Sequence, residues 1–138
     1  MSELTMILDQ ILDFVGSKNS EIPNLFNRGI SMAEVRKIAE VLPFRLKNEI
    51  TELYMWRNGA SNWTDVLGHS FFLPLSMAVI SYEEMIPLDI IDQNNNDSYF
   101  WQVGWFPIFC MDSVYYFVSC RSDASAGKVG SISVRRWV

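Results

Sequence analysis

Residues 105–120 are W-F-P-I-F-C-M-D-S-V-Y-Y-F-V-S-C, and this stretch decides the fold class. Its two apolar runs, Trp105–Met111 and Val114–Cys120, are rich in the aromatic and β-branched residues that favour strands. Asp112-Ser113 lies between the two runs and is the right length for a tight hairpin turn. The stretch therefore predicts two antiparallel strands that follow each other directly in the chain.

Further strands are expected on both sides of this hairpin. Tyr99–Gly104 is a candidate before it, Val129–Arg135 is a candidate after it, and Leu67–Leu75 is an earlier one. Between these strands, the residues from Ser76 to Met85 predict a short helix. The run Asp92–Ser98 predicts a turn or loop, because Asn and Asp favour local backbone hydrogen bonds over strand ladders.

The first 60 residues predict helices. An apolar stripe at helical spacing opens the chain, and it consists of Leu4, Ile7, Leu8, Ile11, Leu12 and Val15. Ser2 is suited to cap the start of this helix, and Gly16 is suited to end it in a left-handed conformation.

Two more helices are expected before residue 60. Ser31-Met32-Ala33-Glu34 is a capping box, and it precedes an apolar side made of Val35, Ile38, Ala39 and Leu42. Leu42-Pro43 predicts a break, since proline disfavours helix in the preceding residue yet suits the first turn of a new helix. The stripe of that next helix consists of Leu46, Ile50, Leu53 and Tyr54, and Asn58-Gly59 is expected to stop it.

Helices followed by consecutive strands imply an α+β fold. We expect N-terminal helices packed on a mainly antiparallel sheet, in a single domain over residues 1–138. At 138 residues the chain is long enough for its own core, and 49% hydrophobic residues make it too apolar for disorder. The N-terminus carries acids and no early Lys or Arg, which is not typical of a signal peptide, so we expect a cytoplasmic protein.

The net charge of −5 is unevenly distributed. From Tyr82 to Asp97 there are acids and no base, and the acids are Glu83, Glu84, Asp89, Asp92 and Asp97. An acidic chain is repelled by nucleic acid and anionic membranes and is attracted to basic partners. Two interpretations of the acidic run stay open: an ordinary solvated loop face, or a surface that binds a partner.

No residue pattern predicts a catalytic residue, a metal site or a cofactor. His69 is the single histidine, and Cys110 and Cys120 have no second Cys pair beside them, so zinc is not expected. The two cysteines are predicted to be buried thiols. Asp92, Asn94 and Asn96 match the first calcium-loop ligands, but the Gly and the final Glu of that loop are missing. Adjacent acids such as Glu83 and Glu84 do not face each other on a helix.

The tryptophans are the remaining candidates for residues that bind a partner protein. Trp56, Trp63, Trp101 and Trp105 are each suited to pack in the core or to anchor an interface, and Trp137 is the least constrained of the five. Both interpretations stay open from the sequence.

Segment Glu34–Gly59 resembles the amino-terminal signature of the SUKH superfamily, which groups fungal Smi/Knr cell-wall regulators with bacterial immunity proteins. That signature has a short helix, Leu-Pro, an amphipathic helix and Asn-Gly. Phe72–Leu75 resembles the family's next strand and turn, and Trp105–Phe109 resembles its Trp-x-Pro-hydrophobic strand. The resemblance covers about residues 30–120, after an N-terminal helix and connection over residues 1–29. The matching fold-motif residues are Leu42, Pro43, Asn58, Gly59, Trp105 and Pro107.

The resemblance implies a non-enzymatic protein-binding module. Bacterial members of the superfamily neutralise polymorphic toxins by direct binding, and many such toxins are basic nucleases. On this hypothesis the partner is a basic toxin domain, and the acidic run from Glu83 to Asp97 would bind it. A regulatory or scaffold protein with a cellular partner is the alternative, and an enzyme with an unrecognised carboxylate site is a third possibility.

Overall fold

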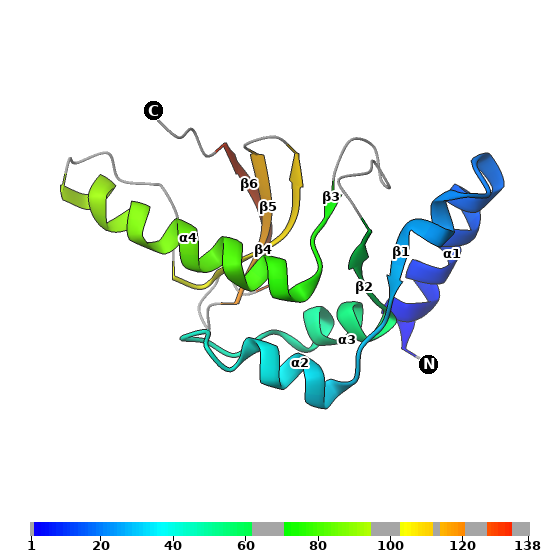
Figure 1. Ribbon diagram of the computed structural model, residues 1–138, viewed down its shortest axis with the longest axis horizontal. Coiled ribbons are helices and arrows are strands. Elements are labelled where there is room, and N and C mark those ends of the chain that lie inside the picture. The colour runs from blue at the N-terminus through cyan, green and yellow to red at the C-terminus, as the bar shows by residue number, and fades with distance from the viewer. Residues whose placement is uncertain (1, 62–70, 95–102, 112–113, 121–126, 134–138) are drawn as a thin grey trace.

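The computed structural model describes residues 2–61, 71–94, 103–111, 114–120 and 127–133 of the chain (Figure 1). In chain order the elements are α1 (Glu3–Lys18), the 3₁₀ helix η1 (Ile22–Leu25), β1 (Phe26–Arg28), α2 (Met32–Ala39), α3 (Asn48–Trp56), β2 (Arg57–Ala60), β3 (Phe71–Phe72), α4 (Leu75–Asn94), β4 (Trp105–Met111), β5 (Val114–Ser119) and β6 (Val129–Ser133). Helices and antiparallel strands together make the predicted α+β fold.

The main sheet has the strand order β3-β4-β5-β6, and each neighbouring pair is antiparallel. The predicted hairpin is confirmed: β4 spans Trp105–Met111, and Met111 pairs with Val114 at its closed end. The turn residues Asp112-Ser113 lie outside the described residues. The register between β4 and β5 shifts after Pro107, which is where a strand can accommodate a residue without an N–H.

A second, two-stranded sheet pairs β1 with β2, and the sequence analysis did not predict it. The helix before it, α3, ends at Trp56, so Asn58 and Gly59 do not stop the helix. They lie within β2, where Gly59 has a φ of +71°. Backbone pairing with β1 extends the chain here, and local helix-stop chemistry does not decide the boundary.

The first helix starts as predicted, because the Ser2 hydroxyl accepts a hydrogen bond from the Thr5 N–H at 3.1 Å. The prediction that Gly16 ends α1 in a left-handed conformation is wrong. The helix continues to Lys18 and is followed by Asn19 in extended backbone. Gly16 instead allows a close approach, since a Cβ there would lie 2.9 Å from Cγ of Pro23.

The capping box at Ser31 is confirmed, with the Ser31 hydroxyl accepting a hydrogen bond from the Glu34 N–H at 3.1 Å. Pro43, however, does not begin the next helix, which starts at Asn48. The intervening segment is irregular and buries the side chains of Leu42 and Leu46. Packing of these two leucines against the core overrides the helical spacing of the sequence.

α4 is much longer than the predicted helix, because it runs through Pro87 to Asn94. Proline removes one hydrogen bond to the carbonyl four residues earlier, which a 20-residue helix accommodates. The predicted loop is therefore wrong for Asp92–Asn94, and the rest of that loop lies outside the described residues.

The other three predicted strands have different outcomes in the structure. In the described part of Leu67–Leu75, which is residues 71–75, the strand is Phe71–Phe72, and Leu75 already begins α4. Of Tyr99–Gly104, the described residues 103–104 form a turn. The last strand, Val129–Ser133, agrees with the prediction over its described residues. Residues 67–70, 99–102 and 134–135 lie outside the description.

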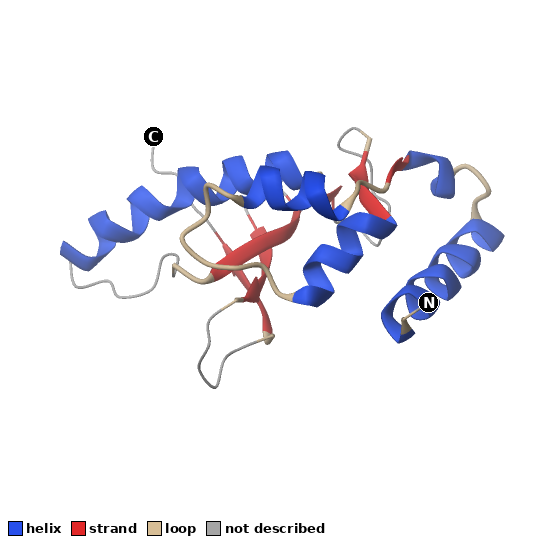
Figure 2. Cartoon of the chain, turned by 90° about the horizontal axis from the view of Figure 1, so that it is seen from below, coloured by secondary structure: helices blue, strands red, loops and turns tan. Residues whose placement is uncertain are grey.

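The core forms where α4 crosses the main sheet (Figures 1 and 2). One side of α4 is buried at helical spacing and consists of Leu75, Ala78, Val79, Tyr82 and Met85. It packs mainly on β4, whose Phe106 and Ile108 are buried. Helices α2 and α3 complete the core through Val35, Ile50 and Tyr54. Of the helices that the structure describes, none is long and apolar enough to cross a membrane.

Candidate functional site

The outward side of α4 carries two apolar side chains followed by two acids. Met77 is 37% exposed and Ile80 is 55% exposed, although both are large and apolar. Glu83 and Glu84 are exposed one turn further along. Met77, Ile80 and Glu84 have the i, i+3, i+7 spacing of one helix face, and Glu83 lies beside them. We call these four residues the α4 face.

The structure describes the other three acids of the predicted run only in part. Asp89 and Asp92 lie in the backbone of α4, about 9 and 14 Å along its axis from Glu83. Their side chains, and all of Asp97, lie outside the described residues. Glu83, Glu84, Asp89 and Asp92 thus belong to one helix that has no basic residue, which corrects the interpretation of this run as a loop face.

A second exposed apolar surface lies on α1, at the opposite end of the molecule from the carboxyl end of α4 (Figures 1 and 2). None of the residues of α1 is buried. Ile7, Ile11 and Phe14 are 46%, 42% and 64% exposed, and they share one helix face. We call these three residues the α1 stripe.

Polar contacts hold α1 to the rest of the fold. The Trp56 indole Nε1–H donates a hydrogen bond to Oδ1 of Asp9 at 2.8 Å. The Thr5 hydroxyl donates another to Oε1 of Glu52 at 3.0 Å. Trp56 therefore has a structural role at the α1–α3 contact, where its ring also packs edge-on against Phe26.

The Asn-Gly motif joins β2 to the start of α4. The Asn58 side-chain Oδ1 accepts a hydrogen bond from the Leu75 N–H at 2.9 Å, which satisfies a free amide at the helix start. Gly59 lies against Pro74, because a Cβ on Gly59 would be 2.3 Å from the Pro74 nitrogen. The Tyr54 hydroxyl donates to the Leu73 carbonyl at 2.9 Å. These contacts give the motif a role in the fold.

The other motif residues also serve packing. Leu42 is buried at the edge of the core, whereas Pro43 is exposed. Trp105 stacks on Phe117 with ring centroids 3.9 Å apart, and Pro107 is fully buried at the strand irregularity. Trp105 is thus partly buried and packs against the core. Trp63, Trp101, Trp137 and His69 lie outside the described residues.

The buried titratable groups are held in their neutral forms. Burial raises the pKa of the Tyr54 phenol far above its usual range, and it raises the pKa of Tyr82 to about 12. Burial also raises the pKa of the Cys120 thiol. The predicted burial of Cys110 and Cys120 is confirmed, and both are free thiols. An activated nucleophile requires a pKa shift in the opposite direction.

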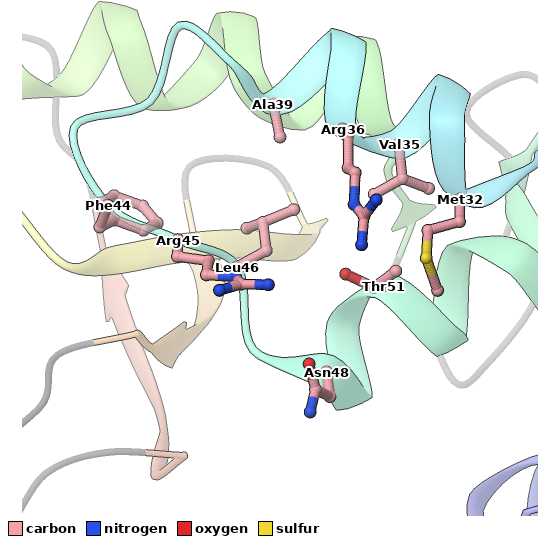
Figure 3. A pocket seen from close by; sticks show the side chains of 9 residues that line it. All are labelled: Met32, Val35, Arg36, Ala39, Phe44, Arg45, Leu46, Asn48 and Thr51. Carbon is pink, nitrogen blue, oxygen red and sulfur yellow. The ribbon is translucent and has the colours of Figure 1, made fainter.

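A hollow of about 170 Å³ lies between α2 and the start of α3 (Figure 3). Its polar lining consists of Arg36, Arg45, Asn48 and Thr51. Its apolar lining consists of Met32, Val35, Ala39, Phe44 and Leu46. Within the described part of the chain, no group of His, Cys, Asp or Glu side chains is arranged to hold a metal ion.

A scan against protein-family models and a search of curated proteins found no match to this chain. The relationship to the SUKH superfamily therefore stays a prediction from the order of the sequence motifs.

Sequence reasoning missed both the hollow and the exposure of the α1 stripe. Arg36 and Arg45 are nine positions apart in the sequence, and no local spacing links them. The irregular segment after α2 brings them together. The α1 stripe has the spacing of a core-facing helix, so its pattern carried no signal of exposure.

Proposed function

We propose that this chain is a protein-binding module whose α4 face docks on a basic partner protein. The observation that carries the proposal is the arrangement of Met77, Ile80, Glu83 and Glu84 on the outward side of one helix. Apolar anchors flanked by charged groups are the usual composition of a protein interface.

The other side of α4 supports this role by fixing the helix in place. Leu75, Ala78 and Val79 are buried against the core, so the outward side chains project from a rigid element. A rigid surface loses little conformational entropy on binding. The partner then gains apolar burial at Met77 and Ile80 without first ordering the site.

The acidic charge of the chain and of α4 indicates which class of partner protein to expect. The chain has a net charge of −5, and α4 carries four acids and no base. Such a surface attracts basic proteins and increases their association rate, most strongly at low salt. A basic partner is thus favoured over an acidic or neutral one.

The finer form of the proposal is an immunity protein that neutralises a cognate basic toxin domain in the cytoplasm. Its support is the ordered set of motifs that resembles the SUKH superfamily, together with the acidic helix. The free thiols Cys110 and Cys120 agree with a reducing compartment. If the partner is instead a cellular regulatory protein, a regulatory function replaces the immunity function.

The test starts with the tagged chain in lysate of the source cells, at low and at high salt. A protein captured in stoichiometric amount is identified, purified and titrated calorimetrically against the wild type. The decisive variant is E83K/E84K, and the matched control is D13K/E21K, which reverses two exposed acids elsewhere. Both variants change the net charge from −5 to −1, so they separate local from global charge.

We expect E83K/E84K to weaken the binding of a basic partner by about tenfold or more, with a shallower salt dependence. The control should bind within about twofold of the wild type. Equal effects of the two variants, or capture of an acidic partner only, would contradict the α4 face as the binding surface. If the captured partner has no toxic activity, the proposal of a protein-binding module stands and the proposal of an immunity function is excluded.

A further inference from the structure

We propose that the hollow between α2 and α3 binds an organic carboxylate that carries a short, branched apolar group. This inference is independent of the proposed role of the α4 face. It rests on the convergence of two arginines, two neutral polar side chains and an apolar wall around one hollow of about 170 Å³ (Figure 3).

Three chain segments build the hollow. On α2, Met32, Val35, Arg36 and Ala39 lie at the i, i+3, i+4, i+7 positions of one helix side. The irregular segment after α2 brings Arg45 to the same place. The first turn of α3 contributes Asn48 and Thr51, which are three residues apart.

The two guanidinium groups are the main reason to expect an anion. Figure 3 shows the Arg36 and Arg45 side chains extending from different segments toward the same space. Among the described residues, neither forms an ion pair with a carboxylate, and no acid lines the hollow. Two positive charges that share a concave site without a counter-ion favour the binding of an anion.

The start of α3 adds to this positive potential. Lys47 at the N-cap makes no side-chain hydrogen bond to the first turn. The amino end of the helix dipole therefore remains without a side-chain cap beside Asn48. The Asn48 amide and the Thr51 hydroxyl are hydrogen-bond donors suited to an oxyanion.

The apolar part of the lining restricts which anions fit the hollow. Val35 and Leu46 are buried, and Phe44 is half-buried, so the floor of the hollow is hydrocarbon. An inorganic ion would leave that floor uncovered. A carboxylate attached to a branched alkyl group would place its oxygens at the arginines and its methyl groups on the floor.

Two sources provide this chemistry: a free organic acid, and a peptide whose C-terminal residue is branched and apolar. The experiment titrates the full chain with isovalerate, with the neutral isostere isovaleramide, with inorganic phosphate, and with an acetylated tripeptide that ends in valine. Chemical shifts of the backbone amides report binding. The variants are Arg36→Gln and Arg45→Gln, with Arg28→Gln as control, because Arg28 is an exposed arginine on β1 outside the hollow.

We expect saturable shifts at Arg36 and Thr51 with isovalerate, at a Kd of about 1–10 mM. Isovaleramide and phosphate should bind at least about tenfold more weakly. Each hollow variant should lose about tenfold in affinity and the control should lose none. A tripeptide that binds tighter than isovalerate identifies a chain end as the source, and one that binds equally or more weakly identifies a free acid.

Three results would overturn the proposal. One is the absence of saturable shifts with both isovalerate and the tripeptide. Another is equal binding of isovaleramide or phosphate, and the third is equal affinity of the hollow variants and the control. Arg36 and Arg45 are exposed, so their replacement leaves the core intact, and thermal unfolding of each variant verifies this.

Discussion

Helices α1 and α3 have similar apolar stripes in the sequence, but in the structure the stripe of α3 is buried and that of α1 is exposed. Ile50 and Tyr54 of α3 are 2% and 0% exposed, whereas Ile7 and Ile11 of α1 are 46% and 42% exposed. α3 lies among α2, β2 and the main core, whereas within the described part of the chain α1 mainly contacts α3 and η1 (Figure 2). Helical spacing identifies an apolar face, but the neighbouring elements determine whether that face is buried.

Replacing one isoleucine in each helix should give the greatest difference in stability. Ile50→Ala should lower the free energy of unfolding by about 3 kcal/mol, because it removes buried methylene groups and leaves a cavity. Ile7→Ala should change it by less than about 0.5 kcal/mol, because that side chain already contacts water. Urea unfolding of both variants measures the difference. Equal losses would show that α1 is packed as tightly as α3 in solution.

The next effect concerns the start of α4. Asn58→Ala should cost about 1.5 kcal/mol, because it leaves the Leu75 N–H without its acceptor in a partly buried site. Asn24→Ala, at an exposed position of η1, is the matched control and should cost less than about 0.5 kcal/mol. The melting temperatures of the two variants, measured by thermal unfolding, distinguish these effects. If both variants melt together, Asn58 does not hold the amino end of α4.

A smaller effect is expected at the attachment of α1. Asp9→Ala should cost about 1 kcal/mol, because it leaves the Trp56 indole N–H without its acceptor. Asp13→Ala, at an exposed acid of the same helix, is the control. Amide hydrogen exchange should become faster in α1 and stay unchanged in α3. Faster exchange in both helices would mean that α1 is part of the cooperative core.

The smallest effect at neutral pH is expected at Tyr82. Its hydroxyl is buried and has no hydrogen-bond partner among the described residues, so Tyr82→Phe should be neutral or slightly stabilising. The pH dependence is more informative. Burial raises the pKa of Tyr82 from 10.0 to about 12 in the folded state, so above pH 10 the unfolded state loses the proton first.

The ionisation of Tyr82 therefore leaves the free energy of unfolding unchanged below pH 10 and lowers it progressively as the pH rises toward 12. Urea unfolding from pH 8 to 12 should show a steeper decline for the wild type than for Tyr82→Phe. Parallel declines would mean that Tyr82 is solvated in the folded protein.

The sequence predicted those parts of the fold whose cause is local. The capping box at Ser31 satisfies amides within one turn, and the runs Trp105–Met111 and Val114–Cys120 pair across two residues. Such contacts close short loops, so their residues lie near each other in the sequence.

The features that depend on distant contacts were not predicted. Asn58 acts on Leu75, 17 positions away, so its role as a cap for α4 cannot be read from its local context. The same holds for Gly16, which is needed for the approach of Pro23. Of the candidate site, Glu83 and Glu84 were identified from charge alone, but Met77 and Ile80 were not. Their exposure depends on which side of α4 meets the sheet.

Methionine oxidation distinguishes docking of the partner on the α4 face from docking on α1. Met77 on α4 is 37% exposed and Met6 on α1 is 51% exposed, so the two residues present the same chemistry on two different helices. Their oxidation rates with hydrogen peroxide are measured by mass spectrometry in the free chain and in the complex with the purified partner. We predict that the partner slows oxidation of Met77 and leaves Met6 unchanged. Slower oxidation of Met6 with Met77 unchanged would exclude docking on the α4 face and place the partner on α1.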